Sequence, residues 1–167
     1  MRRNRRFFLI LAYALEIILL WVLQSTPKLL PALFGAKPFL LLAAALSIAA
    51  REDVVPAIIW GAVCGALADI SAGGTVGYFS IAFVIVCFVQ ASLLDTYLNR
   101  NLLTAGVLTL GSVAAVIGLY FVFFRLFAGV PDCGTLFVSR YLLRMAYTVL
   151  CYIPLYFLNR FLHKSFS

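Results

Sequence analysis

The sequence predicts an all-α integral membrane protein, built as a bundle of six transmembrane helices. The 167-residue chain is 65% hydrophobic and only 11% charged, whereas soluble domains are about half apolar and about a quarter charged. Apolar runs long enough to cross a bilayer also recur along the chain, separated by short polar, proline-rich or glycine-rich breaks. We therefore expect one membrane domain over residues 1–167, with little mass outside the bilayer.

The spans follow from hydropathy and from the residues that interrupt it. The first follows the basic segment MRRNRR, contains Glu16 as its only charge, and ends before Pro27. The second opens at Pro38 and is short in apolar residues, so we expect it to borrow residues from the preceding segment or to lie tilted inside the bundle. Pro154 interrupts the sixth. We place the six spans at about residues 7–24, 36–50, 54–70, 76–94, 102–124 and 138–162.

The distribution of arginine and lysine predicts the orientation. Cytoplasmic segments of membrane proteins carry an excess of these residues. If the N-terminus is inside, six spans return the C-terminus to the cytoplasm, and the inner side receives the N-terminal arginines together with Arg51, Arg100 and Arg160. We therefore expect both termini in the cytoplasm. The net charge of +7 reflects this topology and does not indicate a nucleic-acid partner.

Small residues form a column on the predicted third span. Gly61, Gly65 and Asp69 recur at intervals of four, which places them on one helix face. Glycines at this spacing let two helices approach closely, so we expect a packing seam within the chain, with dimerisation as the alternative. Three further glycines permit a reversal toward the fourth span, namely Gly73, Gly74 and Gly77. The fifth span suggests close packing of the same kind through Gly106, Gly111 and Gly118.

Charged side chains inside the spans are candidates for function, because charge is costly in lipid and normally finds a partner. Asp69 lies near the outer end of the third span, and Arg140 and Arg144 lie at a similar depth in the sixth. We expect Asp69 to pair with one of these arginines across the bundle. The alternative is that Asp69 caps or solvates a helix end at the lipid headgroups.

Glu16 lies about 14 Å along the first span at the α-helical rise, near the middle of the bilayer. Three roles are open to it. A transporter would use it as a proton or substrate ligand. A structural glutamate would hydrogen-bond to neighbouring helices, near Tyr13 or to an arginine of the sixth span. An interface glutamate would face another membrane protein. We favour the structural role.

The sequence does not predict an enzyme. Ser71 and Ser80 have no histidine within reach, and no lysine follows the glycine-rich segment in P-loop register. The single histidine, His163, and the lack of a C-x-x-C pair argue against a metal site. We expect no catalytic residue, no cofactor and no metal.

One stretch, from Lys37 to Gly77, resembles a known family. Lys37-Pro38 opens a short span and Arg51-Glu52 forms the turn after it. The next span then carries, in order, Gly61, Gly65, Asp69, Gly73, Gly74 and Gly77. This succession resembles the rod shape-determining protein MreD family, and the size, basic N-terminus and six-span layout agree with it. The chain departs from the family at Phe39, where a polar residue is frequent, and at Asp53, where glycine is frequent.

The resemblance implies a non-catalytic scaffold in the bacterial cytoplasmic membrane. MreD-like proteins help set cell shape by organising lateral peptidoglycan synthesis. They act with MreC, the actin-like MreB, the glycosyltransferase RodA and a penicillin-binding transpeptidase. Their fold is similar to the six-helix substrate-binding subunits of energy-coupling-factor vitamin transporters. That similarity implies the alternative function, a vitamin-binding subunit, with Asp69, Arg140, Arg144 and Tyr147 as candidate ligands.

Overall fold

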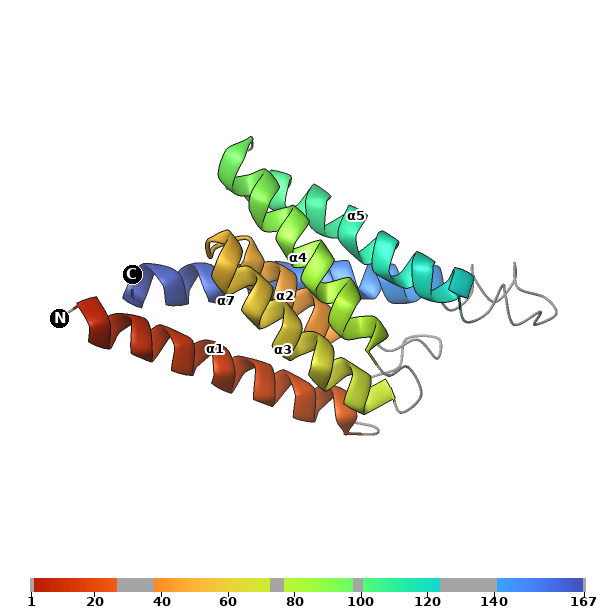
Figure 1. The fold of residues 1–167 in the computed structure, drawn as a ribbon, viewed down its shortest axis with the longest axis horizontal. Helices are drawn as coiled ribbons and strands as arrows, with labels where there is room; N and C mark the ends of the chain where they lie inside the picture. Colours follow the sequence, from red (N-terminus) through yellow and green to blue (C-terminus); the bar gives the residue numbers. More distant parts are fainter. Residues whose placement is uncertain (1, 27–37, 73–76, 98–100, 124–140, 167) are drawn as a thin grey trace.

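The computed structural model describes residues 2–26, 38–72, 77–97, 101–123 and 141–166. These residues form six helices (Figure 1): α1 (Arg2–Ser25), α2 (Leu40–Ala49), α3 (Val54–Ala72), α4 (Tyr78–Thr96), α5 (Leu102–Phe121) and α7 (Leu143–Phe166). The predicted all-α class is confirmed for this part of the chain.

Four helical segments are long and apolar enough to cross a membrane, judged by length and composition: Phe7–Ser25 of α1, and the whole of α3, α4 and α5. Helix α2 has ten residues, which gives a length of about 15 Å, roughly half of the hydrocarbon thickness of a bilayer. Helix α7 has 24 residues and continues through Pro154, so the interruption expected at this proline does not occur. Proline removes one backbone hydrogen bond, and here that loss does not end the helix.

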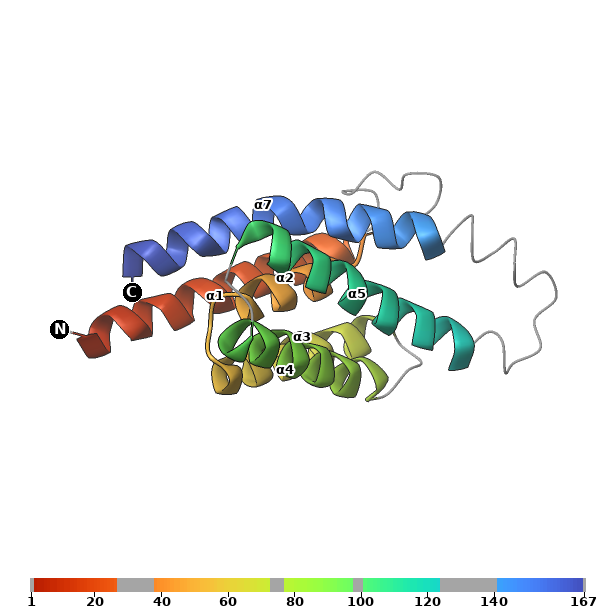
Figure 2. The same cartoon turned by 90° about the horizontal axis from the view of Figure 1, so that it is seen from above.

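The short helix α2 lies at the centre of the bundle. It contacts each of the other five described helices, and Figures 1 and 2 show it enclosed by them. Every residue from Phe39 to Ala50 is buried, and none is more than 5% exposed. The sequence of α2, LLLAAALSIA, is compatible with this position, because a helix that is apolar on all sides can be buried on every face.

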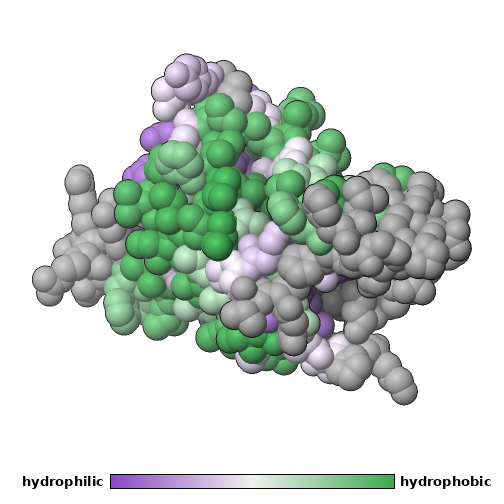
Figure 3. All heavy atoms as spheres, turned by 45° about the vertical axis from the view of Figure 1, so that its right-hand side comes forward, coloured by the Kyte–Doolittle hydropathy of each residue, from purple (hydrophilic) through white to green (hydrophobic). Residues whose placement is uncertain are grey.

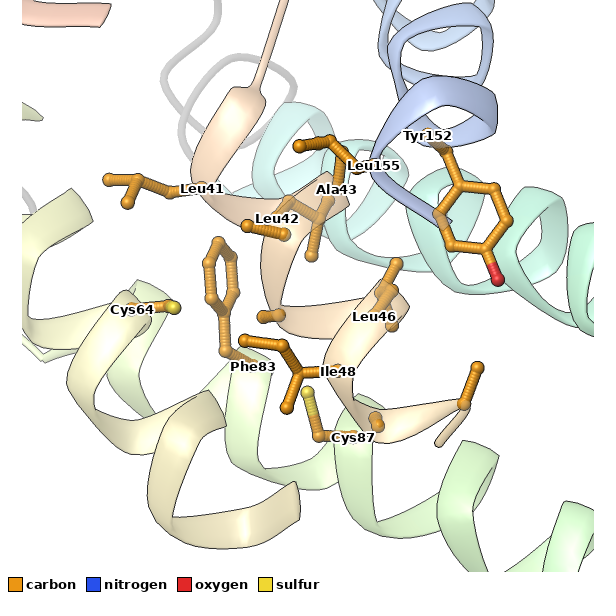
Figure 4. Packing of buried hydrophobic residues seen from close by; sticks show 14 of the residues in the cluster. Leu41, Leu42, Ala43, Leu46, Ile48, Cys64, Phe83, Cys87, Tyr152 and Leu155 are labelled. Carbon is orange, nitrogen blue, oxygen red and sulfur yellow. The ribbon is translucent and has the colours of Figure 1, made fainter. Parts of the chain in front are cut away.

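Close packing around α2 involves helices from both halves of the chain. In Figure 4, Cys64 of α3 and Phe83 and Cys87 of α4 lie on one side of α2, and Tyr152 and Leu155 of α7 lie on the other. All five side chains are buried. Lipid is as apolar as leucine, so inside a membrane it is the van der Waals fit of such side chains, rather than escape from water, that holds helices together.

Two pairs of neighbouring helices show how the chain runs through the bundle. Helices α3 and α4 run antiparallel beside each other and share the most extensive contact in the described chain. Helices α1 and α7 also contact each other, and the two chain ends lie at the same end of the bundle (Figures 1 and 2).

Large apolar side chains cover the outside of the bundle. Phe7 of α1 is 63% exposed, Leu103 of α5 is 83% exposed and Phe161 of α7 is 71% exposed. Figure 3 shows one face, on which apolar residues (green) make up most of the coloured surface. An extensive exposed apolar surface meets something other than water. Together with the four long apolar helices, it fits a membrane-embedded protein.

Candidate functional site

Asp69 caps the N-terminus of α4. Its carboxylate, in the last turn of α3, accepts hydrogen bonds from the backbone N–H groups of Phe79 at 3.1 Å and Ser80 at 3.0 Å. It also accepts a 2.7 Å bond from the Ser80 hydroxyl. The first N–H groups of a helix have no partner within it and carry partial positive charge, so a carboxylate at this point is stabilising. Gly77, which precedes α4, has no side chain that could do this.

The glycine column brings α3 against the backbone of α4. A Cβ atom added at Gly65 would lie 2.5 Å from Ser80 Cα and 2.7 Å from the Phe79 carbonyl oxygen. At Gly61 the added atom would lie 3.0 Å from Cys87 Sγ. The seam predicted from these residues is thus a contact within the chain, between α3 and α4. Asp69 lies one turn beyond Gly65, where this close approach lets its carboxylate reach the start of α4.

The other glycines behave differently. Gly77 has a φ of +85°, in the left-handed region that favours glycine. Gly73 and Gly74 lie outside the described residues. The close packing expected in the fifth span is not found: among described residues, nothing lies within 4 Å of a Cβ added at Gly106, Gly111 or Gly118.

Asp69 was expected to pair with Arg140 or Arg144, and the structure shows no ion pair between Asp69 and Arg144. Both Asp69 oxygens bond to α4, while the Arg144 guanidinium lies over the ring of Phe39, 4.8 Å from its centroid. Arg140 lies outside the described residues. The physical reason is local competition: the start of α4 follows soon after Asp69 in the chain and offers three donors. The structure shows the helix cap of the alternative interpretation, and pairing of Asp69 with Arg140 stays a prediction.

Arg144 borders a small cavity with aromatic walls. Its volume is about 10 Å³, which is room for about one water molecule. The wall consists of Phe39, Phe79, Val116, Ile117, Tyr120, Tyr141 and Arg144. Phe79 and Tyr120 stack with ring centroids 5.5 Å apart. Ligand sites usually measure about 300–1,000 Å³, so the cavity between these described residues is far smaller than an ordinary ligand site.

Glu16 belongs to a buried polar cluster that joins α1, α2 and α7; we call Glu16, Ser47 and Asn159 the Glu16 cluster. Asn159 Nδ2 donates to Glu16 Oε1 at 3.2 Å and to Ser47 Oγ at 2.6 Å. The Ser47 hydroxyl donates to the carbonyl of Ala44 at 2.8 Å. Glu16 is 8% exposed, and Ser47 and Asn159 are fully buried. Glu16 is thus hydrogen-bonded to a neighbouring helix, as the favoured structural role predicts, but its partner is an asparagine rather than an arginine.

A second polar contact reaches α2 from α4. Gln90 Nε2 donates to the carbonyl of Leu46 at 3.1 Å and lies 3.4 Å from Thr109 Oγ1 of α5. The Thr109 hydroxyl donates to the carbonyl of Ala105 in its own helix. Gln90 is 1% exposed and Thr109 is fully buried. This contact connects α2, α4 and α5 through a single side chain.

Side chains from α1 and α7 satisfy the start of α2. The Leu41 N–H donates to Gln24 Oε1 at 3.2 Å, and the Phe39 N–H donates to Thr148 Oγ1 at 3.0 Å. A buried helix start needs such external acceptors, because its first N–H groups have none within the helix. The sequence signal for all these contacts is a polar residue inside an apolar span. It marks Gln24, Ser47, Gln90, Thr109, Thr148 and Asn159, none of which was predicted as a site.

The turn between α2 and α3 contacts both α1 and α7, at the end of the bundle where the termini lie. The Tyr13 hydroxyl donates to Glu52 Oε1 at 3.2 Å, and His163 Nε2 lies 3.9 Å from the same oxygen. The Arg51 guanidinium lies over the Tyr156 ring, 4.3 Å from its centroid. Helices α1 and α7 are thus both attached to this turn.

The polar contacts described above hold the helices of the bundle together. In the described part of the chain, no three His, Cys, Asp or Glu residues are grouped so as to hold a metal ion. Cys64 and Cys87 are free thiols packed inside the core. Among the described residues, the buried polar atoms that lack a hydrogen-bond partner include Glu16 Oε2, Asn159 Oδ1, Gln90 Oε1 and Arg144 Nε.

Comparison with known proteins adds no relative: no family model matches the chain, and neither curated proteins nor solved structures give a match.

Proposed function

We propose that the chain is a six-span protein of the bacterial cytoplasmic membrane that serves as a non-catalytic scaffold, of the MreD type, for the machinery of lateral wall synthesis. The resemblance carried by Lys37 to Gly77 supports this assignment. Within that stretch, Gly61, Gly65 and Asp69 hold the α3–α4 hairpin together. The resembling residues are therefore a structural device, as a scaffold requires.

The observation that carries the proposal is the closed core around α2. This helix is buried from Phe39 to Ala50 and contacts all five other described helices. The centre of the bundle is thus filled by α2, and the cavity beside Arg144 has room for about one water molecule. A rigid body with contact surfaces fits a role in assembly with MreC, MreB, RodA and a penicillin-binding transpeptidase.

The placement of the chain ends supports the proposed topology. Both termini lie at one end of the bundle, together with the turn that contains Arg51 (Figure 1). Arg160 and Lys164 near the C-terminus are exposed, and basic residues gather on the cytoplasmic side of membrane proteins. Alkaline phosphatase and green fluorescent protein fused at each terminus test this. Fluorescence without phosphatase activity at both ends is expected, and phosphatase activity at either end contradicts the topology.

Depletion in a rod-shaped host tests the scaffold function. Cells that lose the protein should become round and should recover when the wild-type chain is supplied. The Asp69→Ala variant, at matched membrane abundance, reports how far this activity depends on the α3–α4 hairpin. Normal rod shape after complete depletion would exclude a shape-determining role.

A vitamin-binding subunit is the second candidate, and one observation favours it. The Arg144 guanidinium lies beside the aromatic residues Phe39 and Tyr120 in a cavity wall, an arrangement that suits an anionic or aromatic ligand. Mass spectrometry of small molecules released from the purified protein tests it. A vitamin released from the wild type and absent from Arg144→Gln would favour this function, and normal cell shape after depletion would accompany it.

A further inference from the structure

Glu16 and Asn159 each keep one buried oxygen without a hydrogen-bond partner. Asn159 Nδ2 donates to Glu16 Oε1, whereas Glu16 Oε2 and Asn159 Oδ1 have no partner in the described part of the chain. Both side chains are more than nine-tenths buried. An ionised carboxylate is only an acceptor, and so is an amide oxygen. In that state the Glu16 cluster therefore contains two unsatisfied acceptors and lacks a donor hydrogen.

None of the described groups that face Glu16 carries a positive charge. Its titratable neighbours within electrostatic range are Tyr13 of α1 and Cys64 of α3, both neutral at physiological pH. Helices α2 and α7 contribute Ser47 and Asn159. Arg51 and Glu52 of the α2–α3 turn interact electrostatically with Tyr13, which is not a member of the Glu16 cluster. A buried carboxylate without a counter-ion is far more costly than the neutral acid, so a proton is the cheapest way to satisfy it.

We propose that Glu16 is a proton-binding site. The carboxyl group holds an exchangeable proton while α1, α2 and α7 are packed together, and it releases the proton when water reaches the Glu16 cluster. The proton supplies the donor hydrogen that the cluster lacks. A metal ion fits less well, because Asn159 turns its amide hydrogens toward both Glu16 Oε1 and Ser47 Oγ, and a hard cation needs oxygen lone pairs on all sides.

Proton binding here is coupled to helix packing. The Glu16 cluster lies where the first and last described helices, α1 and α7, both meet the central helix α2. Release of the proton leaves a negative charge between these helices, and that charge must be hydrated. The proton-free form should therefore have looser contacts between α1, α7 and α2. This inference does not depend on the scaffold function.

The chain contains only two glutamates, Glu16 and Glu52, which makes the test direct. The full-length protein is labelled with glutamate carrying carbon-13 in the side-chain carboxyl and placed in lipid nanodiscs. In the Glu52→Gln variant the single labelled carboxyl belongs to Glu16. Infrared or solid-state NMR spectra at about pH 6, where a solvent-exposed glutamate is ionised, should show it as the protonated acid, converting to carboxylate as the pH is raised further. A carboxylate signal at about pH 6, as an exposed glutamate would give, would overturn the proposal.

Two further variants separate proton binding from simple packing. Glu16→Gln has the shape and hydrogen-bonding groups of the neutral acid, so it should unfold at about the same temperature as the wild type and lose the pH-dependent signal. Asn159→Leu removes the amide donor and should shift the Glu16 titration without abolishing it. If Glu16→Gln folds but is strongly destabilised, Glu16 is charged in the packed bundle, and the proposal fails. The wild-type spectrum, which contains Glu52 as well, decides the question if neither variant folds.

Discussion

Asp69 Oδ2 accepts two hydrogen bonds from Ser80, one from the backbone N–H at 3.0 Å and one from the hydroxyl at 2.7 Å. The bonds join the last turn of α3 to the first turn of α4. Hydrogen bonds to a charged acceptor are about twice as strong as neutral ones, and the positive end of the α4 dipole adds to them. One carboxylate therefore links the end of α3 to the start of α4.

Removal of this cap should destabilise the protein. Asp69→Ala is expected to lower the free energy of unfolding by about 1–2 kcal/mol, the usual effect of deleting an N-terminal cap. Asp69→Asn should lie between the alanine variant and the wild type, because the amide keeps one acceptor. The measurement is the thermal unfolding midpoint in detergent micelles.

The exposed Arg160→Gln, which also removes a charge, is the control and should leave the midpoint unchanged. A charge exchange between positions 69 and 144 tests the excluded ion pair. Recovery of wild-type stability in that double variant would show that Asp69 and Arg144 interact after all.

The glycines of the chain should differ sharply in their tolerance of alanine. At Gly65 the new methyl group would lie 2.5 Å from a backbone carbon of Ser80, so α3 and α4 must separate. We expect a loss of about 1–3 kcal/mol or more, with Gly61→Ala milder because the Cys87 side chain can move. Gly111 is open to substitution, and alanine there should be neutral or stabilise by up to about 1 kcal/mol.

The thermal unfolding midpoint in detergent micelles, measured for Gly61→Ala, Gly65→Ala and Gly111→Ala at equal expression, checks this prediction. Equal sensitivity at positions 65 and 111 would mean that α5 has a close partner in the assembled protein.

Hydropathy predicts the long helices well. The expected spans 54–70 and 76–94 correspond to Val54–Ala72 and Tyr78–Thr96. The reason is physical: a membrane span must be apolar over a fixed length and must satisfy its own backbone. Apolar content alone cannot distinguish a short helix buried among five others from a helix that faces lipid. The central role of α2 is therefore invisible in the sequence.

The sequence does not reveal which groups form hydrogen bonds with the buried polar side chains. The spacing of Gly61, Gly65 and Asp69 predicts a shared face, and the structure places that face against α4. It does not indicate that nearby N–H groups satisfy Asp69 before a distant arginine can. Glu16 and Asn159 are 143 positions apart, so no local pattern links them. Each is recognisable only as a polar residue in an apolar span.

Thr148→Val should be costly although the two side chains have nearly the same shape. The Thr148 hydroxyl accepts the Phe39 N–H at 3.0 Å, and valine would leave this buried donor without a partner. The expected loss is about 1–3 kcal/mol. Thr104→Val, at a half-buried position on α5, is the matched control and should have little effect. Thermal unfolding of both variants checks this, and similar midpoints would mean that another acceptor serves Phe39.

Unlike Thr148, Gln90 should tolerate replacement by an apolar side chain of similar size. Its amide donates to the carbonyl of Leu46, which also accepts the Ala50 N–H at 3.0 Å within α2. Gln90→Leu therefore leaves no backbone group unsatisfied. It also removes Gln90 Oε1, a buried oxygen without a partner among described residues. Replacing such a group by an apolar side chain of similar size is neutral or stabilising, whereas Gln90→Ala opens a cavity and should cost about 2–5 kcal/mol.

Unfolding midpoints of the two Gln90 variants test this contrast, with the wild type as the reference. A large loss in Gln90→Leu would show that the bond to Leu46 or Thr109 holds α4 against α2 and α5 more strongly than its geometry indicates. If Gln90→Leu is as stable as the wild type but fails to restore rod shape in depleted cells, Gln90 is required for function rather than for folding. The leucine and alanine variants together therefore separate the two roles at a position where the sequence alone shows only one amide in an apolar helix.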